Sequence, residues 1–144
     1  MIEPFRLEAE MTPIVRRWLE SMGFAVRPES TLSSGVPDLL AERNGQILAF
    51  ELKLNRVKDA IRQARSYTDH VNQSYVVLPM LRAINVAKQS NQFTGGNYSV
   101  GLIGVDWHDC RVLIPAKQND KPPSHEQTMK RFIRARKKGN NGGR

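Results

Sequence analysis

The stretch GVPDLLAERNGQILAFELKLN, residues 35–55, decides the fold, because it predicts two strands joined by a tight turn. The turn is Asn44-Gly45, the strongest short signal for a hairpin, since both residues tolerate the positive φ of a type I′ turn. A loop at these two positions makes Asp38 face Glu51 across the ladder. Facing residues have Cβ atoms roughly 4.5–5.5 Å apart, so the two carboxylates are expected to be neighbours.

Side-chain alternation separates an apolar face of this hairpin from a partly charged one. The apolar face carries Leu39, Ala41, Leu48, Phe50 and Leu52. The other face carries Asp38, Leu40, Ala49, Glu51 and Lys53. Two close carboxylates repel each other unless a cation or a proton lies between them, and oxygen-only ligands favour hard ions such as Mg²⁺. The open end of the charged face is therefore a candidate Mg²⁺ site.

Lys53 follows Glu51 by two residues and is expected to point the same way. It could orient or activate an attacking water, or stabilise charge that develops on a phosphorus centre. The alternative interpretation is an ordinary Glu-Lys pair on a solvated sheet face. The preceding Pro37-Asp38, the register and the apolar neighbours favour the functional interpretation.

The composition indicates one globular domain. The 144 residues are enough to bury a core, and 40% of them are hydrophobic. No apolar run approaches the ~20 residues of a membrane span. Cys110, the single cysteine, cannot form an internal disulfide, and the three histidines match no zinc spacing. We therefore expect a cytoplasmic protein without a membrane partner.

Positive charge is concentrated at the C-terminal end of the chain. Residues 117–144 hold nine Lys or Arg and two Asp or Glu, whereas residues 1–116 hold 13 and 12. We expect a core over 1–116 and a basic C-terminal helix with a flexible tail over 117–144. Because Lys and Arg displace counterions from phosphate backbones, this segment indicates a polyanion partner, with a solubilising tail as the alternative.

The remaining elements follow from apolar periodicity and turn residues. Helices are predicted at 7–22, 57–71, 80–90 and 125–138. Besides the hairpin, strands are predicted at 24–29, 74–79, 98–106 and 111–116. This order favours an α/β sandwich with a mixed sheet and helices packed against it.

Pro37-Asp38 followed by Glu51-Leu52-Lys53 resembles the signature of the PD-(D/E)XK nucleases, the restriction-endonuclease-like superfamily. The resemblance covers about residues 7–79. It implies a restriction-endonuclease-like α/β sandwich, a central mixed sheet flanked by helices, with 1–116 as the nuclease core. It also implies that Asp38, Glu51 and the Leu52 carbonyl bind Mg²⁺, with Mn²⁺ as a substitute, and that Lys53 acts on the attacking water.

Two further features of this superfamily have counterparts in the chain. Many members carry a glutamate on the first helix, and Glu8 is in phase with the inward stripe there, with Glu10 as the competitor. The resemblance implies that Glu8 completes the acidic cluster. Some branches carry Gln-x-x-x-Tyr on the helix after the lysine strand, as Gln63 and Tyr67 do here. Gln63 would orient a metal-binding group and Tyr67 would contact nucleic acid, with a core tyrosine as the alternative for Tyr67.

Basic side chains on two predicted helices could contact DNA. Lys58, Arg62 and Arg65 are spaced to form one ridge, and Arg56 precedes them. On the last helix the expected phosphate contacts include Lys130, Arg131 and Arg134. The alternative for the ridge is a solvated helix face.

The expected function is a metal-dependent deoxyribonuclease that hydrolyses phosphodiester bonds. The chain contains no separate sequence-reading module, so structure- or end-directed cleavage in DNA repair, recombination or phage DNA processing is favoured. Two branches remain: a small Holliday-junction-resolvase-like endonuclease acting as a homodimer, and a recombination-type exonuclease. A non-catalytic nucleic-acid-binding module of the same fold and a ribonuclease are the alternatives.

Overall fold

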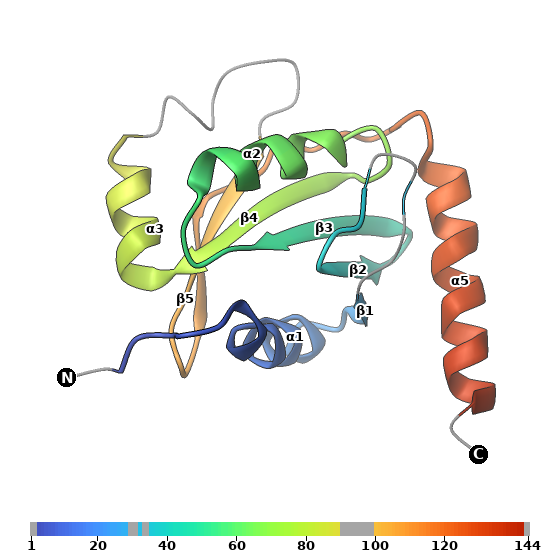
Figure 1. Ribbon diagram of the computed structural model, residues 1–144. Helices are drawn as coiled ribbons and strands as arrows, with labels where there is room; N and C mark the ends of the chain where they lie inside the picture. Colours follow the sequence, from blue (N-terminus) through green and yellow to red (C-terminus); the bar gives the residue numbers. More distant parts are fainter. Residues whose placement is uncertain (1–2, 29–31, 33–34, 90–99, 143–144) are drawn as a thin grey trace.

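Six strands form one mixed sheet in the order β1-β2-β3-β4-β5-β6, within the part of the chain that the computed structural model describes (Figure 1). That part comprises residues 3–28, 32, 35–89 and 100–142, with side chains as far as Ile133. The strands are β1 (Ala25–Pro28), β2 (Leu39–Arg43), β3 (Gln46–Leu52), β4 (Gln73–Pro79), β5 (Gly101–Val105) and β6 (Cys110–Ile114). The helices are the 3₁₀ turn η1 (Glu8–Glu10) and the α-helices α1 (Thr12–Ser21), α2 (Val57–Ser66), α3 (Met80–Ala87) and α5 (His125–Gly142).

The strand directions explain why this sheet is mixed. The central strands β3, β4 and β5 run parallel. Helix α2 lies in the connection from β3 to β4, and α3 lies in the connection from β4 to β5. The pairs β1–β2, β2–β3 and β5–β6 are antiparallel. The order of elements agrees with the sequence prediction, and an α/β fold with an open mixed sheet is confirmed.

The hairpin has the predicted turn and register. Asn44 and Gly45 have φ angles of 53° and 81°, the positive values that a type I′ turn requires. Arg43 pairs with Gln46, and the same register continues along β2 and β3. A shift of one residue would have exchanged the two faces, so this register fixes which side chains reach the core.

The β2–β3 ladder ends before it reaches the two acids. Its last pair is Leu39 with Phe50, and Asp38 lies in a bend one residue earlier. The prediction that Asp38 and Glu51 form a ladder pair is therefore wrong, although both lie at the predicted end of the hairpin.

Helices cover both faces of the sheet. On one face, α1 packs on the apolar side of the hairpin and on β4 and β5. This core contains Ile14, Val15, Leu19, Leu39, Ala41, Leu48, Phe50, Leu52, Val77 and Ile103. On the opposite face, α2 and α3 pack on β4 and β5. That core contains Ala60, Ile61, Ala64, Val76, Leu78, Ala83 and Leu102. Burying a large apolar side chain contributes roughly 1.5–3 kcal/mol, so the first core accounts for the position of α1 and the second for the positions of α2 and α3 over the sheet.

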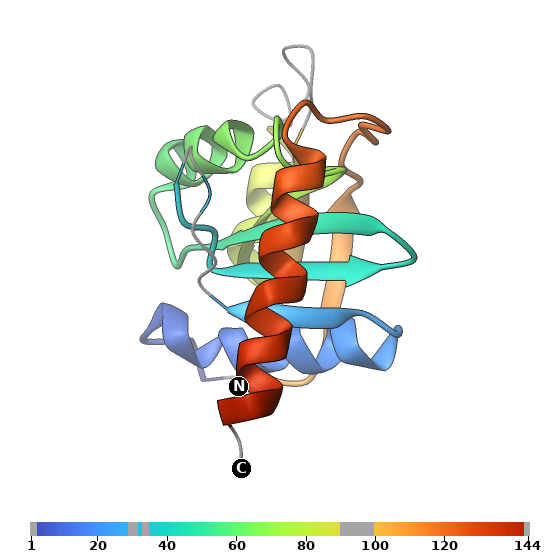
Figure 2. The ribbon, with the colours of Figure 1, turned by 90° about the vertical axis from the view of Figure 1, so that its right-hand side faces the viewer.

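The last helix docks beside the hairpin. Phe132 is buried among side chains of β2 and β3, whereas the neighbouring Ile133 is 46% exposed. His125 Nε2 lies 3.1 Å from the Gly45 carbonyl oxygen, so α5 begins at the hairpin turn. Figure 2 shows α5 crossing the direction of β1, β2 and β3. Phe132 thus anchors α5 on this side of the sheet.

All four helices differ in extent from the prediction, and the third, predicted at 80–90, ends at Ala87. The first one is divided into η1 and α1, because Pro13 lacks a backbone N–H and is suited to a helix start. The second ends at Ser66 instead of residue 71. The last continues to Gly142 through residues assigned to the flexible tail, while 143–144 lie outside the described residues. In none of the described helices do length and apolar composition suffice to cross a membrane.

Candidate active site

Four side chains from three segments of the chain meet at the open end of the hairpin. Glu51 belongs to β3, Lys53 follows it, Asp38 precedes β2, and Tyr67 follows α2. Glu51 is buried, with only 4% of its surface exposed. The Tyr67 hydroxyl donates a hydrogen bond to Glu51 Oε1 at 2.8 Å, and Lys53 Nζ lies 4.0 Å from Oε2. Both oxygens of the buried carboxylate therefore have a neighbour that favours its charged form.

The backbone of β3 fixes Asp38. The Leu52 N–H donates to Asp38 Oδ2 at 2.7 Å, on the side where β2 no longer supplies a carbonyl. The next amide, of Lys53, donates to the Val77 carbonyl oxygen on the β4 side at 3.1 Å. The Asp38 carboxylate thus replaces the missing ladder partner, which explains why it leaves the strand and remains close to Glu51.

The surroundings of Glu51 change its proton affinity. The pKa of Glu51 is raised from 4.5 to about 7, first by burial and then by the charge of Asp38, with a smaller contribution from Glu8. The Tyr67 hydrogen bond and the charge of Lys53 act in the opposite direction. A carboxyl group in this position is stabilised by a proton or by a cation beside it.

The two acids considered for the first helix have different surroundings. Glu8 Oε2 accepts a hydrogen bond from the Leu54 N–H at 3.1 Å, directly after β3. Glu10 Oε1 accepts bonds from the N–H groups of Leu7 and Arg6 at 2.8 and 2.7 Å, and these bonds lower the pKa of Glu10. Glu10 therefore caps η1, and Glu8 is the acid that lies near the candidate site. The helical phase proposed for Glu8 is wrong, because η1 and α1 are separate.

Tyr67 is not available for contact with nucleic acid. Only 2% of its surface is exposed, and its hydroxyl is bonded to Glu51, so the alternative of a core tyrosine describes it better. Burial, followed by the neighbouring Glu51, raises the pKa of Tyr67, so its hydroxyl remains a donor. Gly35, with φ of 147°, lies against the ring, since a Cβ there would come within 3.3 Å of Tyr67 Cε1. The sequence prediction did not include this contact. The glycine two residues before Pro37 was the one signal in the sequence that could have indicated a close approach there.

Gln63 lies one helical turn before Tyr67 and is half-buried. Its Oε1 atom is buried and has no hydrogen-bond partner among the described residues. A buried amide oxygen without a partner is costly, and such atoms often meet a ligand or an ordered water. The role expected for Gln63, orienting a metal-binding group, stays a prediction.

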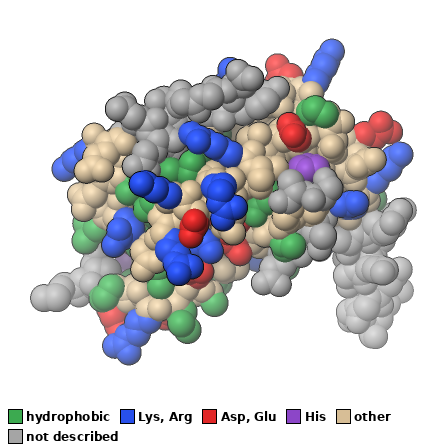
Figure 3. All heavy atoms as spheres, turned by 45° about the horizontal axis from the view of Figure 1, so that its top comes forward, with side chains coloured by type: hydrophobic (Ala, Val, Ile, Leu, Met, Phe, Trp, Pro, Cys, Tyr) green, Lys and Arg blue, Asp and Glu red, His purple; other side chains and the backbone are tan. Residues whose placement is uncertain are grey.

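The cationic side chains predicted on α2 are at the surface. Figure 3 shows Lys and Arg side chains gathered on the face that carries α2, with acidic groups among them. Arg56, Lys58, Arg62 and Arg65 are all exposed. Arg62 lies 3.9 Å from Asp59, an exposed pair that contributes little to stability.

The cations of α5 are placed differently. Lys130 pairs with Glu126 at 3.4 Å, and Arg131 is exposed, while the side chain of Arg134 lies outside the described residues. Because α5 begins at the hairpin turn, its first residues lie at the opposite end of the hairpin from Asp38 and Glu51. The continuous phosphate track from the site to α5 stays a prediction.

The acidic side chains near the open end of the hairpin suit a hard divalent ion. Asp38, Glu51 and Glu8 offer oxygen atoms alone, the donors that Mg²⁺ prefers. No group of three or more His, Cys, Asp or Glu side chains is assembled as a metal site among the described residues. The two hairpin carboxylates therefore fit an ion that keeps several waters and takes further oxygens from a substrate, as Mg²⁺ does.

Comparisons with known proteins indicate the fold alone. No protein-family model matches the chain, and none of the curated proteins matches it. Among solved structures, the chain is similar to a protein of unknown function from Silicibacter pomeroyi, with a TM-score of 0.69 and 17% sequence identity. The match covers 95% of this chain and 88% of that one. At this identity the likeness shows a shared architecture and transfers no activity.

Proposed function

We propose that this chain is a metal-dependent deoxyribonuclease with the restriction-endonuclease-like sandwich of the PD-(D/E)XK superfamily, acting in the cytoplasm. The observation that supports this most is the buried Glu51 carboxylate beside Asp38 and Lys53. Burial and a like charge both oppose ionisation of Glu51, and the protein nevertheless retains the arrangement. Such a combination is typical of functional sites, because a bound cation and substrate compensate for it.

Each side chain has a definable role in phosphodiester hydrolysis. Asp38 and Glu51, with the Leu52 carbonyl, would hold Mg²⁺, which when bound supplies Lewis-acid stabilisation of negative charge on the phosphate. Lys53 provides a cation that can orient a water oxygen for attack on phosphorus and offset charge in the transition state. The water oxygen loses a proton as the new P–O bond forms, and the leaving sugar oxygen takes a proton as its bond to phosphorus breaks, so the products are a phosphate monoester and a hydroxyl group. Tyr67 fixes the orientation of Glu51 through its 2.8 Å hydrogen bond.

DNA as the substrate is supported by the charge around the site. Arg56, Lys58, Arg62 and Arg65 are exposed on or beside α2, which follows the lysine directly in the chain. Contacts of this kind position a phosphate backbone without reading its sequence. The proposal therefore includes structure- or end-directed cleavage.

Incubation of the protein with a panel of nucleic acids tests this proposal. We expect cleavage of at least one DNA among duplex, single-stranded, nicked and branched substrates in Mg²⁺ or Mn²⁺, and none in EDTA. Product ends resolved on sequencing gels distinguish internal from terminal cleavage. Cleavage of RNA alone would favour the ribonuclease, and metal-independent binding with no cleavage of any substrate would favour a non-catalytic module.

Glu8→Gln is expected to reduce the cleavage rate about tenfold, whereas Glu10→Gln should leave it within about twofold. A glutamine at position 8 can still accept the Leu54 N–H, so this variant removes charge and keeps the contact. Glu10→Gln makes the same chemical change in the η1 cap and controls for local destabilisation. Initial rates over a Mg²⁺ series check the prediction, and a larger loss at Glu10 would reverse the assignment.

A further inference from the structure

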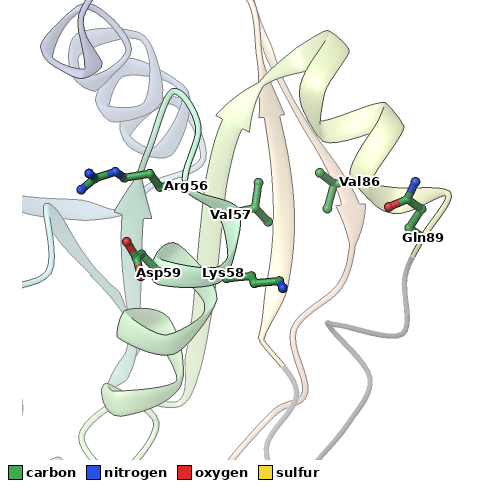
Figure 4. Close-up of a pocket in the computed structure, with 6 residues that line it drawn as sticks. All are labelled: Arg56, Val57, Lys58, Asp59, Val86 and Gln89. Carbon is green, nitrogen blue, oxygen red and sulfur yellow. The ribbon is translucent and has the colours of Figure 1, made fainter.

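A hollow of about 380 Å³ lies between the start of α2 and the end of α3 (Figure 4). It is lined by Arg56, Val57, Lys58, Asp59, Val86 and Gln89. Val57 and Val86 face each other across it, and both pack on the core beneath α2 and α3. The volume falls within the roughly 300–1,000 Å³ range of small-ligand sites, so the hollow suits one compact group between two apolar walls.

The rim of this hollow carries net positive charge. Arg56 and Lys58 are exposed, and the one acid of the lining, Asp59, lies 3.9 Å from Arg62. The first turn of α2 adds the partial positive charge of a helix N-terminus. Apolar walls and a cationic rim together complement a ligand that joins a flat organic group to an anion.

The position of the hollow relates it to the candidate active site. Arg56 follows Lys53 by three residues, and an extended chain spans at most about 3.6 Å per residue, so their Cα atoms lie within about 11 Å. Arg56 has φ of 56° and ψ of 51°, a left-handed conformation that is uncommon for a residue with a long side chain. This bend turns the chain from β3 into α2 and sets Val57 toward α3.

We propose that the hollow binds the base and sugar of one unpaired nucleotide next to the cleaved phosphodiester, an inference that rests on the proposed function. The base packs between Val57 and Val86, and the Gln89 amide offers a donor and an acceptor to its edge. Arg56 and Lys58 contact the flanking phosphates. A base stacked inside a duplex cannot enter such a space, so the hollow selects single strands, frayed ends or unpaired junction nucleotides.

Abasic scanning of a single-stranded DNA overhang tests this subsite. The probe is a fluorescein-labelled hairpin DNA duplex with a short single-stranded thymidine overhang, whose junction with the duplex sets the register; one overhang base at a time is removed, and binding is measured by anisotropy in EDTA. Loss of the base that occupies the hollow is expected to weaken binding by the wild-type protein about tenfold, with small effects at the other positions.

Two variants on α3 make the test specific. Val86→Glu, which introduces a carboxylate into the hollow, is expected to weaken binding of the intact oligonucleotide about tenfold and to abolish the response to base removal. Leu81→Glu is the matched control, because Leu81 lies on the same helix, is 79% exposed and is not part of the lining. This control should bind within about twofold of the wild type and keep the response.

Several outcomes would overturn the subsite. A flat abasic profile in the wild type, or equal losses in Val86→Glu and Leu81→Glu, would do so. If Val86→Glu fails to fold by circular dichroism, Gln89→Ala replaces it and should weaken binding about threefold, with a smaller response to base removal. If the protein cleaves DNA in Mg²⁺ but its abasic profile is flat, the nucleotide subsite is rejected and the nuclease proposal is retained. A position-specific profile without cleavage rejects the nuclease and retains the nucleotide site.

Discussion

Replacing Glu51 by Gln is expected to reduce the rate of DNA cleavage in Mg²⁺ by about 10²–10³-fold, the usual cost of removing one electrostatic group from an active site. Glutamine keeps the shape of the side chain and can still accept the Tyr67 hydroxyl, so the variant removes charge without opening a cavity. DNA affinity measured in EDTA should be unchanged or higher, because the substitution removes a negative charge near the phosphate backbone. Single-turnover rates at saturating enzyme separate this chemical defect from binding.

The control for this experiment lies in the same hairpin. Glu42 is on β2 near the turn, where its Oε2 accepts the Gly45 N–H at 3.1 Å, far along the strand from Asp38. Glu42→Gln makes the same chemical change and should leave the cleavage rate within about twofold. Wild-type activity in Glu51→Gln, or an equal loss in both variants, would remove the hairpin carboxylates from the mechanism.

The hairpin could be predicted because its signals are local. Asn44-Gly45 defines the turn, and once the turn is defined the period of two along each strand assigns every side chain to a face. The order of the sheet elements follows from similar short patterns. Local patterns therefore identify which residues lie at the open end of the hairpin and on which side.

The detailed contacts of the site depend on packing that these patterns do not contain. No local pattern predicts that Asp38 leaves the ladder to accept the Leu52 N–H, since that depends on where β2 ends. The inward position of Tyr67 follows from its burial in the cluster that contains Leu40 and Ala49 and from its close contact with Gly35. Glu8 accepts the Leu54 N–H from a 3₁₀ turn, whereas the sequence prediction placed Glu8 on an α-helix in phase with its apolar stripe. In each case a tertiary contact fixes the position of a side chain that the local pattern could only mark as a candidate.

The metal-free protein is expected to lose stability as Glu51 ionises. The folded-state pKa of Glu51 is about 7 and the ordinary value is 4.5, so between these values the native protein binds more protons than the unfolded chain. Stability therefore falls as the pH rises from about 4.5 and levels off above about 7, with a total cost on the order of 3 kcal/mol. Glu51→Gln cannot ionise and should lack this component. Urea unfolding of both proteins in EDTA between these pH values measures the difference.

The same unfolding measurement with Mg²⁺ tests whether Glu51 binds the ion, as proposed. An ion that binds the native protein beside Asp38 and Glu51 stabilises it by mass action and favours the charged carboxylate. Adding Mg²⁺ at pH 8 should therefore raise the unfolding free energy of the wild type and have much less effect on Glu51→Gln. The Glu42→Gln protein should respond as the wild type does. If Mg²⁺ raises the unfolding free energy of all three proteins equally, Glu51 does not bind the ion. If the unfolding free energies of the wild type and Glu51→Gln depend on pH in the same way in EDTA, burial does not destabilise the charged Glu51 carboxylate.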